Sequence, residues 1–178
     1  MITPAVAPAR LVGDLRAALG KDRVHTGPTE LNLYRRDGSN MEGSSSVICF
    51  PTSTEEVQAC VQAARRHGAL AVPAHPGRFG IGLVEYLAQG EAFDDVGIVE
   101  RLNGGSRPGE NERADDLCQE RGFLGTGGSD AHLASHIATC LTQFQADIRR
   151  EAELVEALLS GQFRPVRLAE TTNGSARS

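Results

Sequence analysis

Residues 122–132, GFLGTGGSDAH, decide the fold, because a short apolar run passes directly into a glycine-rich loop that carries Asp130 and His132. The apolar part predicts a β-strand, so both polar side chains follow its carboxyl end. Upstream, AHPGR at 74–78 places His75 at the end of another predicted strand. In parallel α/β proteins the carboxyl ends of the strands lie at one edge, where ligands and catalytic residues gather. We therefore expect these side chains to converge.

The rest of the chain alternates helices and strands. The helix 9–19 has one apolar face, and the helix after Ser53 begins with capping-box spacing to Glu56 and ends before Gly68. With a strand at 46–50 and another at 69–74, this helix predicts a βαβ unit. Further along we expect a strand at 95–102, helices at 111–121 and 151–160, and strands at 122–126 and 163–168. The fold class is α/β.

Two imidazoles and one carboxylate form a common catalytic zinc set, which leaves one position open for a water that the metal acidifies. His75, Asp130 and His132 are such a set. The alternative is that they are vestigial polar residues at strand ends. Arg78 has the bidentate geometry that suits a phosphate, although a surface arginine after a turn explains it equally well.

Glu100 and Asn103 stand at the end of the third predicted strand and are candidates to orient the site, but a simple turn at Asn103-Gly104-Gly105 is favoured. His136 stands four residues after His132, a spacing that two metal ligands on one helix can have, but a helix-surface role is favoured. His67 is explained by its place near the carboxyl end of a helix.

Composition excludes several classes of partner. The net charge is −5, with 18 basic and 23 acidic residues and 4% aromatic residues, so an extended nucleic-acid partner is not expected. No apolar run approaches the roughly 18 residues of a transmembrane helix, and residues 1–10 do not resemble a signal peptide. We expect a cytoplasmic protein that does not enter a membrane.

The four cysteines are expected to be packing residues: Cys49, Cys60, Cys118 and Cys140.

From residue 69 to about 168 the chain resembles the C-terminal part of a PHP (polymerase and histidinol phosphatase) metal-dependent phosphoesterase. The matching stretches are AHPGR at 74–78, Ile98-Val99-Glu100 with Asn103-Gly104, GTGGSDAH at 125–132, Thr142-Gln143-Phe144, and Leu154 to Gly161. The resemblance implies part of a distorted (β/α) barrel, a divalent metal such as Zn or Mn, and a small phosphorylated substrate. The family's opening His-x-His motif is missing, so a cluster of two or three metals is not expected.

Residues 11–68 resemble the start of FAD-linked oxidases of the glycolate oxidase and D-lactate dehydrogenase type. The stretches are 15–24, 33–39, 47–51, Ser53 to Val57, and 63–68. In that family the next strand leads into an Arg-Gly-x-Gly-Thr loop whose amides hold the FAD pyrophosphate. Here AHPGR stands in that place, so FAD binding is not expected.

The two resemblances predict three segments: an oxidase-like segment at 1–68, a PHP-like half domain at 69–170 and a flexible tail at 171–178. The function that follows is a PHP-type phosphoesterase with His75, Asp130 and His132 as metal ligands, and with Arg78 and Glu100 as catalytic residues. One alternative is a non-catalytic fusion remnant whose open sheet edges need self-association or a partner chain. Another is a fragment of an FAD-linked oxidase.

Overall fold

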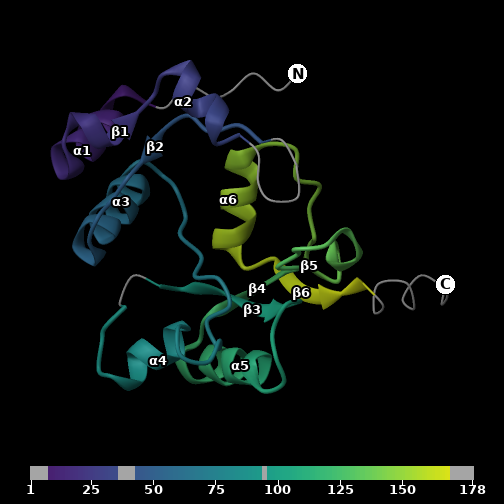
Figure 1. Ribbon diagram of the computed structural model, residues 1–178. Coiled ribbons are helices and arrows are strands. Elements are labelled where there is room, and N and C mark those ends of the chain that lie inside the picture. Colours follow the sequence, from purple (N-terminus) through teal and green to yellow (C-terminus); the bar gives the residue numbers. More distant parts are fainter. Residues whose placement is uncertain (1–7, 36–42, 94–95, 169–178) are drawn as a thin grey trace. The chain divides into compact units, whose positions relative to one another are not determined.

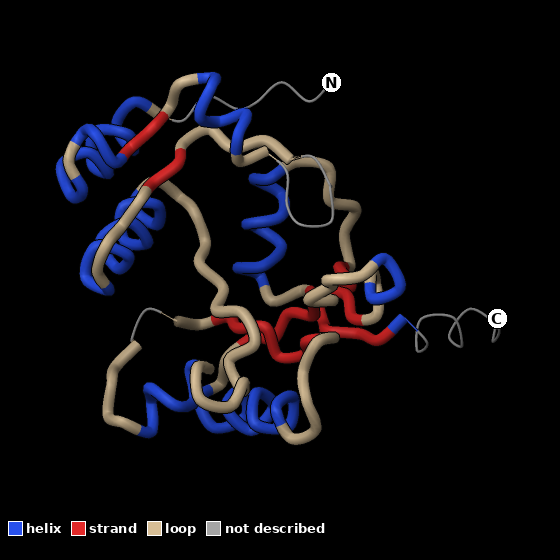
Figure 2. The backbone as a smooth tube through the Cα atoms, in the orientation of Figure 1, coloured by secondary structure: helices blue, strands red, loops and turns tan. Residues whose placement is uncertain are grey.

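The computed structural model describes residues 8–35, 43–93 and 96–168 (Figure 1). The chain divides into two compact units, a first unit at residues 1–70 and a second unit at residues 71–178. Figure 2 shows that both units combine helices with short strands.

The first unit is built on two amphipathic helices. Its elements are α1 (Ala9–Leu19), a 3-10 turn (Lys21–Arg23), β1 (Val24–His25), α2 (Pro28–Leu33), β2 (Ile48–Cys49) and α3 (Thr54–Arg66). β1 and β2 pair in antiparallel register, with Val24 opposite Cys49. The buried centre consists of Leu15, Leu19, Val24 and Ala63. The apolar faces of α1 and α3 therefore form the core together with Val24 of β1.

The start of α3 is fixed by side chains. Ser53 is the N-cap residue, and its hydroxyl accepts a hydrogen bond from the Glu56 amide at 3.3 Å. Glu56 in turn accepts from the Thr52 amide at 2.7 Å and from the Arg23 guanidinium at 2.6 Å on both carboxylate oxygens. The arginine therefore ties the end of the 3-10 turn to the first turn of α3 through a bidentate ion pair.

The second unit holds two strand pairs and three helices within its described residues. Its elements are α4 (Leu83–Ala88), β3 (Ile98–Asn103), α5 (Glu110–Arg121), β4 (Leu124–Gly128), a 3-10 turn (Ala134–His136), β5 (Cys140–Phe144), α6 (Glu151–Ser160) and β6 (Phe163–Arg167). β3 and β4 are parallel and are joined by α5, whereas β5 and β6 are antiparallel. The buried centre contains Leu83, Val99, Leu117 and Cys118. Side chains of α4 and α5 therefore cover the β3 strand.

The four longer helices confirm the sequence predictions, and Gly122 and Gly161 end α5 and α6 in the left-handed conformation. The predicted strands at 122–126 and 163–168 are present as β4 and β6. Of the predicted strand 95–102, Asp95 lies outside the described residues. The sequence also predicts a glycine- and serine-rich loop at 37–46, of which residues 37–42 lie outside the described residues, as does the whole predicted tail 171–178.

The predicted βαβ unit is wrong. Residues 69–74 form no strand, and a single backbone hydrogen bond, from the Glu100 amide to the Pro73 carbonyl at 2.9 Å, joins them to β3. Proline lacks the amide that would extend a ladder, which accounts for the interruption. The strand predicted at 46–50 shrinks to Ile48–Cys49, and its partner is β1 in antiparallel register.

The architecture is a mixed α/β fold with small sheets. Each of the three sheets has two strands, and no closed barrel is formed by the described residues. Within the same ranges, none of the helices is both long and apolar enough to cross a bilayer. The feature that positions polar groups for chemistry is the parallel β3–β4 pair, whose carboxyl ends lie side by side.

Candidate functional site

The polar site lies at the carboxyl ends of β3 and β4. Glu100 lies opposite Thr126 and Asn103 opposite Gly128, with an irregularity in the register between Glu100 and Leu102. Beyond β4, the Ser129 hydroxyl donates to the Cys140 carbonyl at 3.1 Å, which anchors the start of the next loop to β5. We call His75, Arg78, Glu100, Asn103 and Asp130 the strand-end cluster.

Glu100 holds one side of the strand-end cluster. Its Oε2 accepts a hydrogen bond from the His75 backbone amide at 2.7 Å and another from Asn103 Nδ2 at 2.9 Å. A Cβ added to Gly128 would overlap Glu100 Oε1, so this carboxylate occupies space that the glycine leaves open on the neighbouring strand. Glu100 thus positions the loop that begins at His75.

Asp130 and Arg78 form the other side of the cluster. Arg78 NH2 donates to Asp130 Oδ2 at 2.6 Å, with the two side chains 22% and 20% exposed. This hydrogen bond from Arg78 is the main reason why the pKa of Asp130 lies below its usual value, and burial opposes it. Asn103 and the charge of His132 lower the pKa of Asp130 further. The carboxylate is therefore ionised at neutral pH.

The backbone of the cluster is strained at two places. His75 has a φ of 33° and Asp130 a φ of 48°, in the left-handed region that residues other than glycine rarely adopt. His75 Nδ1 is also buried and has no hydrogen-bond partner within the described residues. Strained backbone and an orphaned buried polar atom are both unusual, and functional sites are where they concentrate.

His132 lies at the edge of the cluster and is 82% exposed. Its Nδ1 is 2.9 Å from the backbone oxygen of Asp130 and 4.0 Å from Asp130 Oδ1. Because a carbonyl oxygen only accepts, Nδ1 must carry the proton, and in the neutral ring Nε2 keeps its lone pair for a ligand. His136 lies in a 3-10 turn, so the two histidines do not share an α-helix, and neither the paired-ligand alternative nor the favoured helix-surface role has the α-helix that it needs.

The donor set fits a metal only in part. His75 Nδ1, Asp130 Oδ1 and His132 Nε2 are the available donor atoms, but Asp130 Oδ2 is held by Arg78. No three His, Cys, Asp or Glu side chains in the described part of the chain lie where they could share one ion. A metal held by all three predicted ligands therefore requires a rearrangement, and no catalytic step through a metal follows from this arrangement.

Sequence reasoning placed Glu100 and Asp130 near each other through the parallel strands, and they lie in one cluster. It did not find the Arg78–Asp130 ion pair or the hydrogen bond from the His75 amide to Glu100. It also missed the glycines that make room: a Cβ on Gly105 would lie 2.8 Å from Asp130 Oδ2. The density of glycine around both strand ends was the available signal.

Cys118 and Cys140 are buried and Cys49 and Cys60 are partly buried, as predicted for packing residues. Burial is the main cause that raises the pKa of the Cys49 thiol to about 11, and the neighbouring Cys60 adds to it. A thiol with that pKa is not an effective nucleophile at neutral pH.

His67 is the C-cap residue of α3, as its predicted place near the end of a helix requires. Its Nε2 also lies 3.0 Å from Asp14 Oδ2, a contact that the sequence did not predict.

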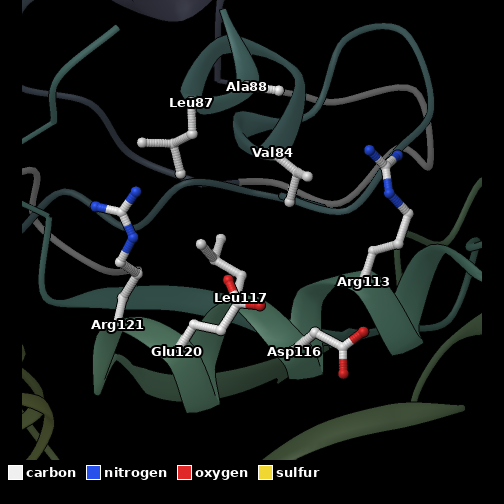
Figure 3. Close-up of a pocket in the computed structure, with 8 residues that line it drawn as sticks. All are labelled: Val84, Leu87, Ala88, Arg113, Asp116, Leu117, Glu120 and Arg121. Atoms are coloured by element: carbon white, nitrogen blue, oxygen red, sulfur yellow. The ribbon is translucent and has the colours of Figure 1, made fainter. Parts of the chain in front are cut away.

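A separate cavity of about 400 Å³ lies between α4 and α5 (Figure 3). Val84, Leu87 and Leu117 form its apolar part, with Arg113 and Arg121 on opposite sides of the view. Arg113 pairs with Glu85 at 2.7 Å. None of the strand-end cluster lines this cavity, so the cavity and the polar site are distinct features of the second unit.

Comparison with known proteins finds related sequence for parts of the chain. Residues 108–163 match the family model described as PHP-associated, which includes Asp130 and His132 but not His75, Arg78 or Glu100. The chain is also 34% identical over 97 residues to the D-2-hydroxyglutarate dehydrogenase of Stutzerimonas stutzeri (strain A1501), an alignment that covers 52% of this chain. The chain spans only 21% of that protein's length. No solved structure matches significantly.

Proposed function

We propose that the second unit supplies part of the site of a PHP-type metal-dependent phosphoesterase, which hydrolyses a small phosphate ester. The match to the PHP-associated family supports the context, since it contains the Asp130 and His132 loop. The observation that carries the proposal is the buried, unpartnered Nδ1 of His75, in a residue held at positive φ beside Glu100. An imidazole nitrogen left without a partner is a group that a ligand can satisfy.

In this proposal His75, Asp130 and His132 hold one Zn or Mn ion, and Arg78 contacts the substrate phosphate. Glu100 positions the His75 loop through its hydrogen bond to the backbone. A bound divalent metal would supply an acidified water as the nucleophile. The proposal applies to a form of the site in which Asp130 has left Arg78, because that pair occupies one carboxylate oxygen.

Two other functions compete with the phosphoesterase. The similarity to D-2-hydroxyglutarate dehydrogenase favours a fragment of an FAD-linked oxidase. The absence of three converging metal donors among the described residues favours a non-catalytic fusion that associates with itself or with a partner chain. Bound flavin would support the first of these, and a large apparent mass without metal or flavin would support the second.

The test is metal content, measured by inductively coupled plasma mass spectrometry on protein that elutes as a discrete species in size exclusion. We expect about one Zn or Mn per chain, the stoichiometry of a single site. Asp130→Asn and His132→Ala should each remove this metal, whereas the control His136→Ala should retain it. Full metal content in both site variants would contradict the proposed ligand set. Metal-loaded protein would then be assayed against a panel of phosphomonoesters.

A further inference from the structure

Two cysteines of the first unit, Cys49 in β2 and Cys60 in α3, pack against the same buried centre. Cys49 lies opposite Val24 in the antiparallel β1–β2 pair, and residues directly opposite each other in such a pair place their side chains on one face. Cys60 stands three residues before Ala63, a spacing that puts both side chains on one face of α3. Val24 and Ala63 both belong to the buried centre, so the two thiols reach it from different elements.

The two thiols also interact with each other. Burial is the first cause that raises the pKa of the Cys49 thiol to about 11, and the charge of Cys60 and a hydrogen bond between the two side chains raise it further. The pKa of Arg23 is raised chiefly by its hydrogen bond to Glu56, and the charge of Cys60 contributes as well. Cys60 is therefore the thiol that has a cation nearby, and a nearby cation favours a thiolate. Both thiols are partly buried rather than buried, so a small oxidant can reach them.

We propose that Cys49 and Cys60 form a reversible disulfide within the chain when the protein meets a peroxide, so that the first unit carries an oxidation site of its own. The Cys60 thiolate attacks one oxygen of hydrogen peroxide; a sulfur–oxygen bond forms, the oxygen–oxygen bond breaks and hydroxide leaves. The Cys49 thiol then attacks the sulfenic sulfur of Cys60, and its proton leaves with the hydroxyl group as water. Contact between the two sulfurs compensates for the weak nucleophilicity of Cys49, because the second step is intramolecular. This inference does not rest on the proposed function.

The experiment exposes the reduced full chain to hydrogen peroxide, alkylates the remaining thiols and measures tryptic peptides by mass spectrometry. Trypsin cleaves after Arg36 and Arg65, so the single peptide 37–65 carries both cysteines of the pair, whereas Cys118 and Cys140 fall in two other peptides. We expect peptide 37–65 to lose both alkyl groups and two hydrogens while the other two peptides stay alkylated. Dithiothreitol should restore both alkylation sites. A peptide 37–65 that stays fully alkylated until Cys118 and Cys140 react would overturn the proposal, and so would disulfides that join two chains.

The same reaction in concentrated urea is the control for the fold, because the two cysteines are near in sequence as well as in space. We expect the disulfide to form about tenfold faster, or more, in the folded protein than in urea. Equal rates would show that the fold does not bring the thiols together. Neither comparison needs a variant.

Two variants test the order of the steps. With dimedone present to trap sulfenic acid, Cys49→Ser should carry the adduct on Cys60, and Cys60→Ser should carry little on Cys49. An adduct on Cys49 in Cys60→Ser, with none on Cys60 in Cys49→Ser, would overturn the assignment of Cys60 as the attacking thiol.

Discussion

The two units each contain an arginine–carboxylate pair at 2.6 Å, but the pairs lie in different surroundings. In the first unit Arg23 and Glu56 join a 3-10 turn to the start of a helix. The Thr52 amide donates to Glu56, and the Glu56 amide donates to the Ser53 hydroxyl, as at an ordinary helix N-cap. In the second unit Asp130 has a left-handed backbone, and a glycine lies against its carboxylate. An ion pair alone therefore does not distinguish a scaffold from a site; its backbone and its neighbours do.

The same contrast extends to buried polar groups. Glu110, which is 1% exposed, is fully used within the scaffold of the second unit: it accepts from the amides of Arg107 at 2.8 Å and Phe79 at 3.1 Å. His75 Nδ1, in the loop whose Phe79 amide contacts Glu110, has no hydrogen-bond partner within the described residues. Satisfied groups stabilise a fold, whereas an unsatisfied one costs free energy unless a ligand completes it.

The largest effect is expected where the loop of the strand-end cluster meets α5. A Cβ on Gly77 would overlap the Glu110 carbonyl and lie 2.9 Å from the Ala114 amide, and backbone cannot move aside cheaply. Gly77→Ala should lower the free energy of unfolding by about 2–4 kcal/mol. Chemical denaturation measures this, and hydrogen exchange should locate the loss in α5. Gly97→Ala is the control in the same unit, because its Cβ would meet nothing within 4 Å. An equal loss of stability in Gly97→Ala would show that the contact with α5 is not the cause.

A smaller effect is expected from the scaffold pair in the first unit. The Arg23 guanidinium is the main cause that lowers the pKa of Glu56 from 4.5 to about 2. Because the folded-state pKa is depressed, the carboxylate stabilises the fold above pH 4.5, and this contribution is lost as pH falls toward 2.

Glu56→Gln should therefore melt at a lower temperature than the unsubstituted protein at pH 7, and the difference should shrink between pH 4.5 and 2. Thermal melts followed by circular dichroism across this range provide the check. Glu55→Gln, beside it in the first turn of α3 but outside the Arg23 pair, is the comparison. A difference that stays constant with pH would show that the pair does not set the acid stability of this unit.

The smallest effect is expected at a helix position far from any strain. Gly13 lies inside α1, and a methyl group at its Cα would meet nothing within 4 Å, so Gly13→Ala should raise the free energy of unfolding by about 0.5–1 kcal/mol. Gly20→Ala should act in the opposite sense, because Gly20 follows the same helix at a φ of 85°. Denaturant midpoints of the two variants compare them directly; a gain at both positions would contradict this account of the backbone.

Much of the helical structure could be predicted from the sequence because its signals are local. Ser53 and Gly161 mark helix ends through their own chemistry, and the apolar spacing between such ends defines the buried face. Strand pairing could not be predicted in the same way. Ile48–Cys49 pairs with Val24–His25, a choice that depends on tertiary packing rather than on either short segment. The helices at 28–33 and 83–88 were also missed, since six residues carry too little periodicity.

The position of Glu100 and Asp130 at one edge could be predicted, but their hydrogen-bond partners could not. Parallel strands bring Glu100 and Asp130 to one edge, which follows from alternation of strand and helix alone. Which acceptor Arg78 takes depends on distances across 52 residues of sequence, and spacing carries no information on that. The orphaned nitrogen of His75 likewise results from what surrounds it in space.

All three described strand pairs close within one unit or the other, each between segments fewer than about 30 residues apart. During synthesis the last helix of the first unit, α3, is complete at Arg66, before any strand of the second unit has been made. Both strands of the first unit, β1 and β2, are therefore already synthesised while the second unit is still being translated. Each unit can settle its pairings in turn, and neither has to wait for the other to choose the correct partner strand.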